Sequence, residues 1–216
     1  MAIAAAVSDE AADTCLGAHA MGVSRGGRML LASVDFELRA GELLQLHGPN
    51  GSGKSSLLRV LCGLLPPASG EVRWNAQPVR AGDSHFLPAV AYMGHADGID
   101  ADLSAAENLR FAAQLAGKTS HDAQIDACLD ALGMAWAAHS PVRALSQGQR
   151  RRVALARLAL LPCALWLLDE PLSGLDEEAA ARFDILLQAH LRRGGMAVVA
   201  THQPLSPPGR ILRLDA

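Results

Sequence analysis

The sequence predicts an α/β protein with a parallel core sheet, an antiparallel sheet near the N-terminus and a helical insertion. Three observations support this fold class. Continuous apolar runs of strand length alternate with helical patterns, as in parallel sheets that are covered on both faces. Residues 34–38 alternate in polarity, as a half-buried strand does. Twenty glycines and eleven prolines among 216 residues supply many tight turns.

Strand patterns occupy much of the first hundred residues. After residues 34–38, residues 43–47 predict a short, mostly apolar strand, and a Gly-rich turn leads into a helix over residues 53–62. Turn residues then precede residues 71–74, which predict another antiparallel strand, and residues 90–93 have the pattern of a buried strand.

Helical patterns follow from about residue 97 to residue 160. Ser104 and Glu107 form a capping box that starts the first of these helices. Its apolar face is expected to comprise Leu109, Phe111, Ala112 and Leu115. A second helix is marked by Ile125, Leu129 and Leu132. A third opens with the capping pair Ser146 and Gln149 and buries Val153, Leu155, Leu158 and Ala159.

The C-terminal part predicts two buried strands joined by a helix. Residues 164–168 and 197–200 are apolar runs typical of a parallel sheet, and the helix over residues 177–193 is ended by Gly194-Gly195. The most apolar stretch of the chain, residues 153–168, is interrupted by Arg157 and Pro162 and is too short to span a membrane.

Composition and length limit the domain organisation and the class of protein. Residues 1–18 are expected to form a loose leader, and residues 19–216 a single domain with the helical part inserted in its core. The formal charge of −3 argues against a general nucleic-acid binder. The short apolar N-terminus lacks the basic start of a secretory signal. The cysteines are widely spaced and are best explained as small buried hydrophobes in a reducing compartment: Cys15, Cys62, Cys128 and Cys163.

A phosphate-binding loop lies between the strand over residues 43–47 and the following helix. Residues 48–55 match the pattern GxxxxGK[ST] at every fixed position. Its glycines allow backbone amides to surround phosphate, Lys54 is expected to bridge the β- and γ-phosphates, and the Ser55 hydroxyl to ligate Mg²⁺. The candidate nucleotide-binding residues here are Gly48, Pro49, Asn50, Gly51, Ser52, Gly53, Lys54, Ser55 and Ser56.

Two acidic residues end the buried strand over residues 164–168. Because parallel strands present their carboxyl ends at one edge, Asp169 and Glu170 are expected beside the phosphate-binding loop. Asp169 would hold Mg²⁺ directly or through water. Glu170 would act as general base for the attacking water.

Three further motifs lie between residues 145 and 202. Residues 145–149 read Leu-Ser-Gln-Gly-Gln, residues 169–176 read Asp-Glu-Pro-Leu-Ser-Gly-Leu-Asp, and Thr201-His202 follows a buried strand. In this order they resemble the signature, the Walker B and D-loop segment and the switch histidine of ATP-binding-cassette (ABC) ATPases. The corresponding signature residues are Leu145, Ser146, Gln147, Gly148 and Gln149. The corresponding D-loop residues are Ser173, Gly174, Leu175 and Asp176.

This resemblance implies an ABC-type P-loop fold with a RecA-like core, an N-terminal antiparallel β subdomain and an inserted α-helical subdomain. It implies ATP and Mg²⁺ as cofactors and catalytic roles for Lys54, Glu170 and His202. It also implies a head-to-tail homodimer in which the signature of one subunit faces the P-loop of the other. The signature has Gln147 where Gly is usual, but Ser146 and Gly148 remain, so we expect tuned rather than lost activity.

Other positions depart from the usual ABC pattern or carry no clear role. The adenine-stacking aromatic is absent before residue 34, and the guanidinium of Arg25 is the candidate in its place. The Q-loop glutamine is replaced by His95, which is a candidate contact to Mg²⁺-bound water or γ-phosphate. The arginines of residues 150–152 are expected to form a solvated helix face, with some available to a partner or nucleotide.

Several segments narrow the resemblance further. Four of them resemble segments of the ATP-binding subunits of the haem exporter of cytochrome c maturation. They are Tyr-Met-Gly-His at residues 92–95, residues 104–111, residues 151–157, and Thr-His-Gln-Pro-Leu at residues 201–205. That family implies a CcmB-like membrane permease with CcmC- and CcmD-like proteins, at the cytoplasmic face of a bacterial inner membrane. Direct haem binding is not expected, and the remaining histidines are interpreted as ordinary core or surface residues: His19, His47, His85, His121, His139 and His190.

The sequence leaves three alternatives open. Another compact ABC transporter ATPase with a different cargo would share the fold and the site. A non-transport ABC ATPase would be expected to carry a long coiled-coil insertion or a second cassette. A small-molecule kinase of the P-loop class would need neither residues 145–149 nor the D-loop.

Overall fold

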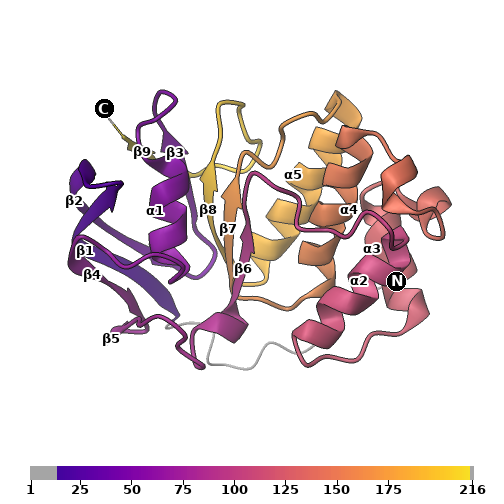
Figure 1. Cartoon of the computed structure of the whole chain (residues 1–216), viewed down its shortest axis with the longest axis horizontal. Coiled ribbons are helices and arrows are strands. Elements are labelled where there is room, and N and C mark those ends of the chain that lie inside the picture. Colours follow the sequence, from indigo (N-terminus) through magenta and orange to yellow (C-terminus); the bar gives the residue numbers. More distant parts are fainter. Residues whose placement is uncertain (1–13, 215–216) are drawn as a thin grey trace.

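The molecule is arranged in layers on both faces of a parallel β-sheet. In the computed structural model, residues 14–214 are described. An antiparallel sheet and helix α1 (Lys54–Leu61) lie on one side of the parallel sheet, and the remaining helices lie on the other (Figure 1). Among the described residues, no helix is long and apolar enough to cross a membrane.

The parallel sheet has the strand order β6-β7-β8-β3-β9. These strands are β3 (Leu43–His47), β6 (Val90–Met93), β7 (Leu165–Asp169), β8 (Met196–Ala200) and β9 (Arg210–Arg213). Strands β7 and β8 are buried throughout, because alternate side chains enter different cores. Leu165 and Leu167 pack with α1 and the antiparallel sheet, whereas Trp166 and Leu168 pack with the helices on the other face.

The antiparallel sheet has the order β2-β1-β4-β5. Its strands are β1 (Cys15–Arg25), β2 (Arg28–Arg39), β4 (Ser69–Trp74) and β5 (Gln77–Pro78). Strands β1 and β2 form a hairpin whose turn is Gly26-Gly27, with φ of 57° and 77°. Glycine suits this turn because both residues lie in the left-handed region.

The helical part packs on the far face of the parallel sheet. It contains α2 (Ala105–Leu115), α3 (Asp122–Ala131) and α4 (Gln147–Leu160), and α5 (Glu177–Arg192) lies beside it (Figure 1). Short 3₁₀ turns span Leu87–Ala89, Ala135–Ala137 and Val142–Ala144. Both predicted capping boxes are confirmed: Ser104 caps α2 with Glu107, and Ser146 caps α4 with Gln149.

Several expectations about individual elements were wrong. Strand β1 begins at Cys15, so residues 15–18 do not belong to a leader, and residues 1–13 lie outside the described residues. The hairpin partner of β2, the short β5 and the edge strand β9 were not predicted from the sequence. The apolar face assigned to α2 is wrong in part: Leu109 is buried as predicted, but Phe111 and Leu115 are 51% and 73% exposed, and the buried face is completed by Ala105 and Ala113.

Candidate functional site

The candidate site lies where strands β3, β7 and β8 reach their carboxyl ends. The phosphate-binding loop follows β3, Asp169 ends β7, and Thr201-His202 follows β8. These strands are parallel and neighbouring, so their carboxyl ends meet at one edge of the sheet. The segment that carries His95 follows β6, which pairs with β7 at the same edge.

The phosphate-binding loop is a tight turn that ends in helix α1. Gly51 and Gly53 have φ of 86° and 99°, which other residues rarely adopt, and Gly53 is the N-cap residue of α1. A Cβ on Gly48 would collide with the carbonyl oxygen of Leu214, so a side chain is excluded there. The loop also packs against β2, because a Cβ on Gly53 would lie 3.4 Å from Leu31.

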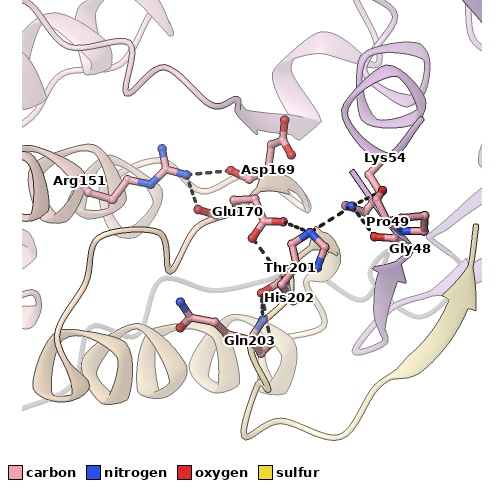
Figure 2. Close-up of polar contacts among 9 residues, drawn as sticks. All are labelled: Gly48, Pro49, Lys54, Arg151, Asp169, Glu170, Thr201, His202 and Gln203. Carbon is pink, nitrogen blue, oxygen red and sulfur yellow. Dashed lines mark hydrogen bonds and ion pairs between the residues drawn. The ribbon is translucent and has the colours of Figure 1, made fainter. Parts of the chain in front are cut away.

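Lys54 is buried inside this loop and joins it to the end of β8. Its side chain is 7% exposed, and Nζ donates to the carbonyl oxygens of Gly48 at 2.7 Å and Pro49 at 3.1 Å. The same ammonium lies 3.3 Å from Nε2 of His202 (Figure 2). A cation held within a glycine-rich loop is suited to binding phosphate oxygens.

His202 lies between this lysine and the acidic residue Glu170. Its Nε2 is 3.5 Å from Oε1 of Glu170, and its backbone N–H donates to Oε2 at 3.4 Å (Figure 2). The tautomer decides the role of Nε2, because it accepts a hydrogen bond from Lys54 when it carries no hydrogen and donates toward Glu170 when it carries one. Thr201 shapes the turn: its hydroxyl donates to the carbonyl of Gln203 and accepts from the Gln203 amide.

Glu170 has an unusual backbone and a carboxylate oxygen, Oε1, that lies 3.5 Å from His202 Nε2 without a hydrogen bond. Its φ is 48°, in the left-handed region, which costs a non-glycine residue about 1 kcal/mol or more. Its amide donates to the carbonyl of Ala200 at 2.8 Å. Oε1 is buried and accepts no hydrogen bond from any described residue. An oriented acceptor of this kind can receive a proton from a water molecule.

The residues expected to hold Mg²⁺ fit it in part. Asp169 is buried at the end of β7, and Ser55 is partly buried in the first turn of α1. One hydroxyl and one carboxylate suit Mg²⁺, which is usually bound through one or two protein oxygens, phosphates and water. His95 is exposed beyond β6 and offers nitrogen rather than oxygen. Among residues 14–214, no group of three or more His, Cys, Asp or Glu is placed to hold a metal ion.

The signature segment forms the exposed N-terminus of α4. The Ser146 side chain accepts from the amide of Gln149, whose own side chain accepts from the Ser146 amide. A Cβ on Gly148 would lie 2.5 Å from the carbonyl oxygen of Gly174, so this position is restricted to glycine. Gln147 is exposed, which explains why a long side chain is tolerated at that position.

The D-loop joins β7 to α5 and touches the signature. Ser173 and Gly174 are exposed, and Leu175 is partly buried against the core of the helical face. Asp176 is the N-cap of α5, because its Oδ1 accepts from the amide of Ala179 at 2.8 Å. The contact of Gly174 with Gly148 places the D-loop against the start of α4 within one chain.

Two candidates stay unconnected to the centre formed by Lys54, His202 and Glu170. Arg25 is exposed at the end of β1, on the hairpin that packs against the phosphate-binding loop. His95 is exposed in the segment after β6. Their roles toward adenine and Mg²⁺ remain predictions.

Arg151 was missed by the sequence analysis. The arginines of residues 150–152 were expected to form a solvated face, but Arg151 is only 4% exposed. Its guanidinium contacts the turn after β7 and the segment after β6. The signal was its spacing, since Arg151, Leu155 and Leu158 recur along one side of α4, and both leucines are buried.

Comparison with known proteins relates most of the chain to one group. A family model described as ABC transporter matches residues 31–173. The cytochrome c biogenesis ATP-binding export protein CcmA of Cupriavidus pinatubonensis is 58% identical over 199 residues, covering 92% of this chain and 88% of that protein. The protein of the same name from Nitrosospira multiformis is 44% identical over 189 residues, covering 88% of this chain and 92% of that protein.

Solved structures show the same fold. An ABC transporter ATP-binding protein from Pyrococcus furiosus has a TM-score of 0.83 at 23% identity, covering 93% of this chain and 97% of that chain. An ATP-binding subunit of an ABC transporter has a TM-score of 0.78 at 25% identity, covering 88% of this chain and 80% of that chain. The expected fold class is therefore confirmed.

Proposed function

This chain belongs to the ABC transporter family, and we propose that it binds and hydrolyses ATP to drive the haem exporter of cytochrome c biogenesis. The observation that carries the ATPase part is the series Lys54, His202 and Glu170 at one edge of the sheet, with 3.3 and 3.5 Å between neighbouring groups. The identity of 58% with a cytochrome c biogenesis export protein over 92% of the chain supports the transport part.

The residues divide the reaction among themselves. The phosphate-binding loop and Lys54 bind the β- and γ-phosphates, and Ser55 with Asp169 would hold Mg²⁺, which supplies charge neutralisation at the phosphate oxygens. Glu170 accepts a proton from the attacking water at Oε1, which accepts no hydrogen bond from a described residue. His202 bridges the base and the phosphate-binding lysine, so it orients both ends of the reacting system.

A second copy of the chain completes the site. Ser146 and the amides at the exposed start of α4 form an anion-binding helix N-terminus that is suited to a γ-phosphate. In a head-to-tail homodimer, this signature segment would face the phosphate-binding loop of the other copy. ATP then joins the two copies, and its hydrolysis releases them, which is a ligand-driven two-state switch.

The helical part is the proposed docking face for a CcmB-like membrane permease that works with CcmC- and CcmD-like proteins. It exposes three large apolar side chains, Phe111, Leu115 and Trp136, which are 51%, 73% and 65% exposed. Apolar surface of this kind supports contact with a partner protein. The chain would then act peripherally at the cytoplasmic face of a bacterial inner membrane.

Hydrolysis is tested with purified chain and Glu170→Gln. We expect the variant to bind ATP, to lose steady-state hydrolysis by about 10²-fold or more, and to accumulate an ATP-dependent dimer in size-exclusion chromatography. Lys54→Ala is the contrasting variant, because it should lose ATP binding itself. Unchanged hydrolysis by Glu170→Gln would exclude Glu170 as the base.

The transport role is tested in cells. The tagged chain should copurify from solubilised membranes with a permease and haem-handling proteins, and its deletion should abolish holocytochrome c formation. Complementation with Glu170→Gln should fail, whereas the wild-type gene should restore the cytochromes. Recovery of an unrelated permease with normal cytochromes would exclude the haem-export assignment.

A further inference from the structure

Arg151 is a buried guanidinium that connects three separate segments. Within residues 14–214 it donates five hydrogen bonds, which use all of its N–H groups. Nη2 donates to the carbonyls of Asp169 and Glu170, both at 2.8 Å, and Nε donates to the carbonyl of Pro171 at 3.3 Å (Figure 2 shows the first two). Besides its own helix α4 and residues 169–171, Arg151 contacts a third segment, residues 94–97, through Nη1.

Residues 169–171, whose carbonyls accept hydrogen bonds from Arg151, form the turn in which the backbone of Glu170 is strained. A φ of 48° at Glu170 is unfavourable unless surrounding contacts impose it. The Glu170 amide donates to the carbonyl of Ala200, and its carbonyl accepts from Arg151 at 2.8 Å and from the Ser173 amide at 3.1 Å. Bonds to a charged donor are stronger than neutral ones, so Arg151 supplies much of this restraint.

The other end of the guanidinium holds the segment after β6, where the Q-loop position His95 lies. Nη1 donates to the carbonyl of Gly94 at 3.2 Å and to Oδ1 of Asp97 at 2.9 Å. Arg157, two turns further along α4, donates to the carbonyl of Gly98. Residues 94–98 are therefore attached to α4 at both ends.

Because Arg151 itself lies on α4, it joins the signature helix, the Q-loop segment and the Glu170 turn at one point. A shift of α4 or of residues 94–98 must move the guanidinium together with the three carbonyls of residues 169–171, or break some of the five hydrogen bonds of Arg151. We propose that Arg151 is a positioning residue that fixes the Glu170 carboxylate relative to the Q-loop segment and the signature helix. This inference rests on the proposed role of Glu170 as the base.

The test compares Arg151→Met, which keeps the length of the side chain and removes every donor, with the matched control Arg152→Met. Arg152 is the next residue of α4 and is partly buried. We expect Arg151→Met to lower kcat by about 10- to 100-fold, because small displacements of a reacting group have effects of that size. KM for ATP should stay within about threefold, and Arg152→Met should keep kcat within about twofold.

A double-mutant cycle separates positioning from general destabilisation. In a Glu170→Gln background, Arg151→Met should cause almost no further loss of the residual single-turnover rate, because there is no base left to position. A loss as large as in the wild-type background would overturn the inference. If the single variant Glu170→Gln hydrolysed ATP at the wild-type rate, that result would instead refute the proposed function.

Two milder variants keep the test decisive where Arg151→Met folds poorly. Arg151→Lys keeps the charge but offers donors from one atom only, so its kcat should lie between those of wild type and Arg151→Met. Asp97→Asn keeps an oxygen acceptor for Nη1 and removes its charge, and we expect a smaller loss of kcat with the same dependence on Glu170. Normal kcat in both variants would overturn the inference.

Discussion

At the residue scale, the candidate site depends on a few groups whose partners lie far away in the sequence. Lys54 and His202 are separated by 148 positions and lie 3.3 Å apart. Glu170 joins the same series through His202. Lys54 is therefore linked through His202 to Glu170, two side chains that follow different strands, and each residue can be tested by single substitution.

His95 is the residue whose substitution tests the Q-loop departure. His95 is exposed after β6, and Gln is the usual residue at this position in the family that the sequence resembles. We expect His95→Gln to retain much of the hydrolytic activity, because an amide oxygen suits a Mg²⁺–water network at least as well as imidazole. Steady-state hydrolysis at several pH values is the measurement. An inactive variant would show that the imidazole has a separate function.

At the element scale, two helices start with the same kind of capping box, but only one of these boxes has a further proposed function. Ser104 caps α2 and Ser146 caps α4, each through the amide of the residue three positions later. Only the start of α4 lies in the signature segment. The pair therefore offers a matched comparison of a cap that stabilises a helix with a cap that is also proposed to face nucleotide.

We expect Ser104→Ala and Ser146→Ala each to lower the free energy of unfolding by about 1 kcal/mol, because each loses one N-cap bond. Only Ser146→Ala should also lower the rate of ATP hydrolysis per folded molecule. Urea unfolding and steady-state hydrolysis below the unfolding range are the measurements. Equal hydrolysis in both variants would contradict a nucleotide role for Ser146.

At the scale of the whole molecule, the parallel sheet and α5 share a buried histidine. The His190 ring stacks on Trp166 with centroids 3.9 Å apart, and its Nε2 lies 3.0 Å from the carbonyl oxygen of Met196. Burial lowers the pKa of His190 to about 4, with a smaller contribution from Arg193, although the Met196 carbonyl acts in the opposite direction. A Cβ on Gly195 would collide with the ring, so glycine is required there.

Because the pKa of His190 is lowered in the folded protein, we expect the free energy of unfolding to decrease in acid. Between its ordinary pKa of 6.5 and the folded value of about 4, the unfolded chain binds the proton more readily. The contribution of neutral His190 to the free energy of unfolding is thus complete above about pH 6.5, and it declines by about 3 kcal/mol as the pH falls to 4. His190→Phe keeps a ring on Trp166 and should show a shallower decline in urea-unfolding free energy over this range. An equal decline in both proteins would contradict the assignment.

The sequence by itself determined the features that are encoded locally. The phosphate-binding loop, both capping boxes and the strands at residues 43–47 and 90–93 follow from contiguous residues whose backbone preferences and polarity patterns need no distant partner. The order of the motifs along the chain was sufficient to indicate the ABC transporter family.

The tertiary structure decided which of several possible faces and partners are used. In α2, alanines lie on more than one side, so only packing against α3 and α4 selected Ala105 and Ala113 over Phe111 and Leu115, whereas Leu109 is buried as predicted. Arg151 is charged, and the carbonyls of a strained turn, the carbonyl of Gly94 and the carboxylate of Asp97 make its burial favourable. Such partners come from segments that meet only in the folded chain, so the sequence pattern around each residue cannot specify them.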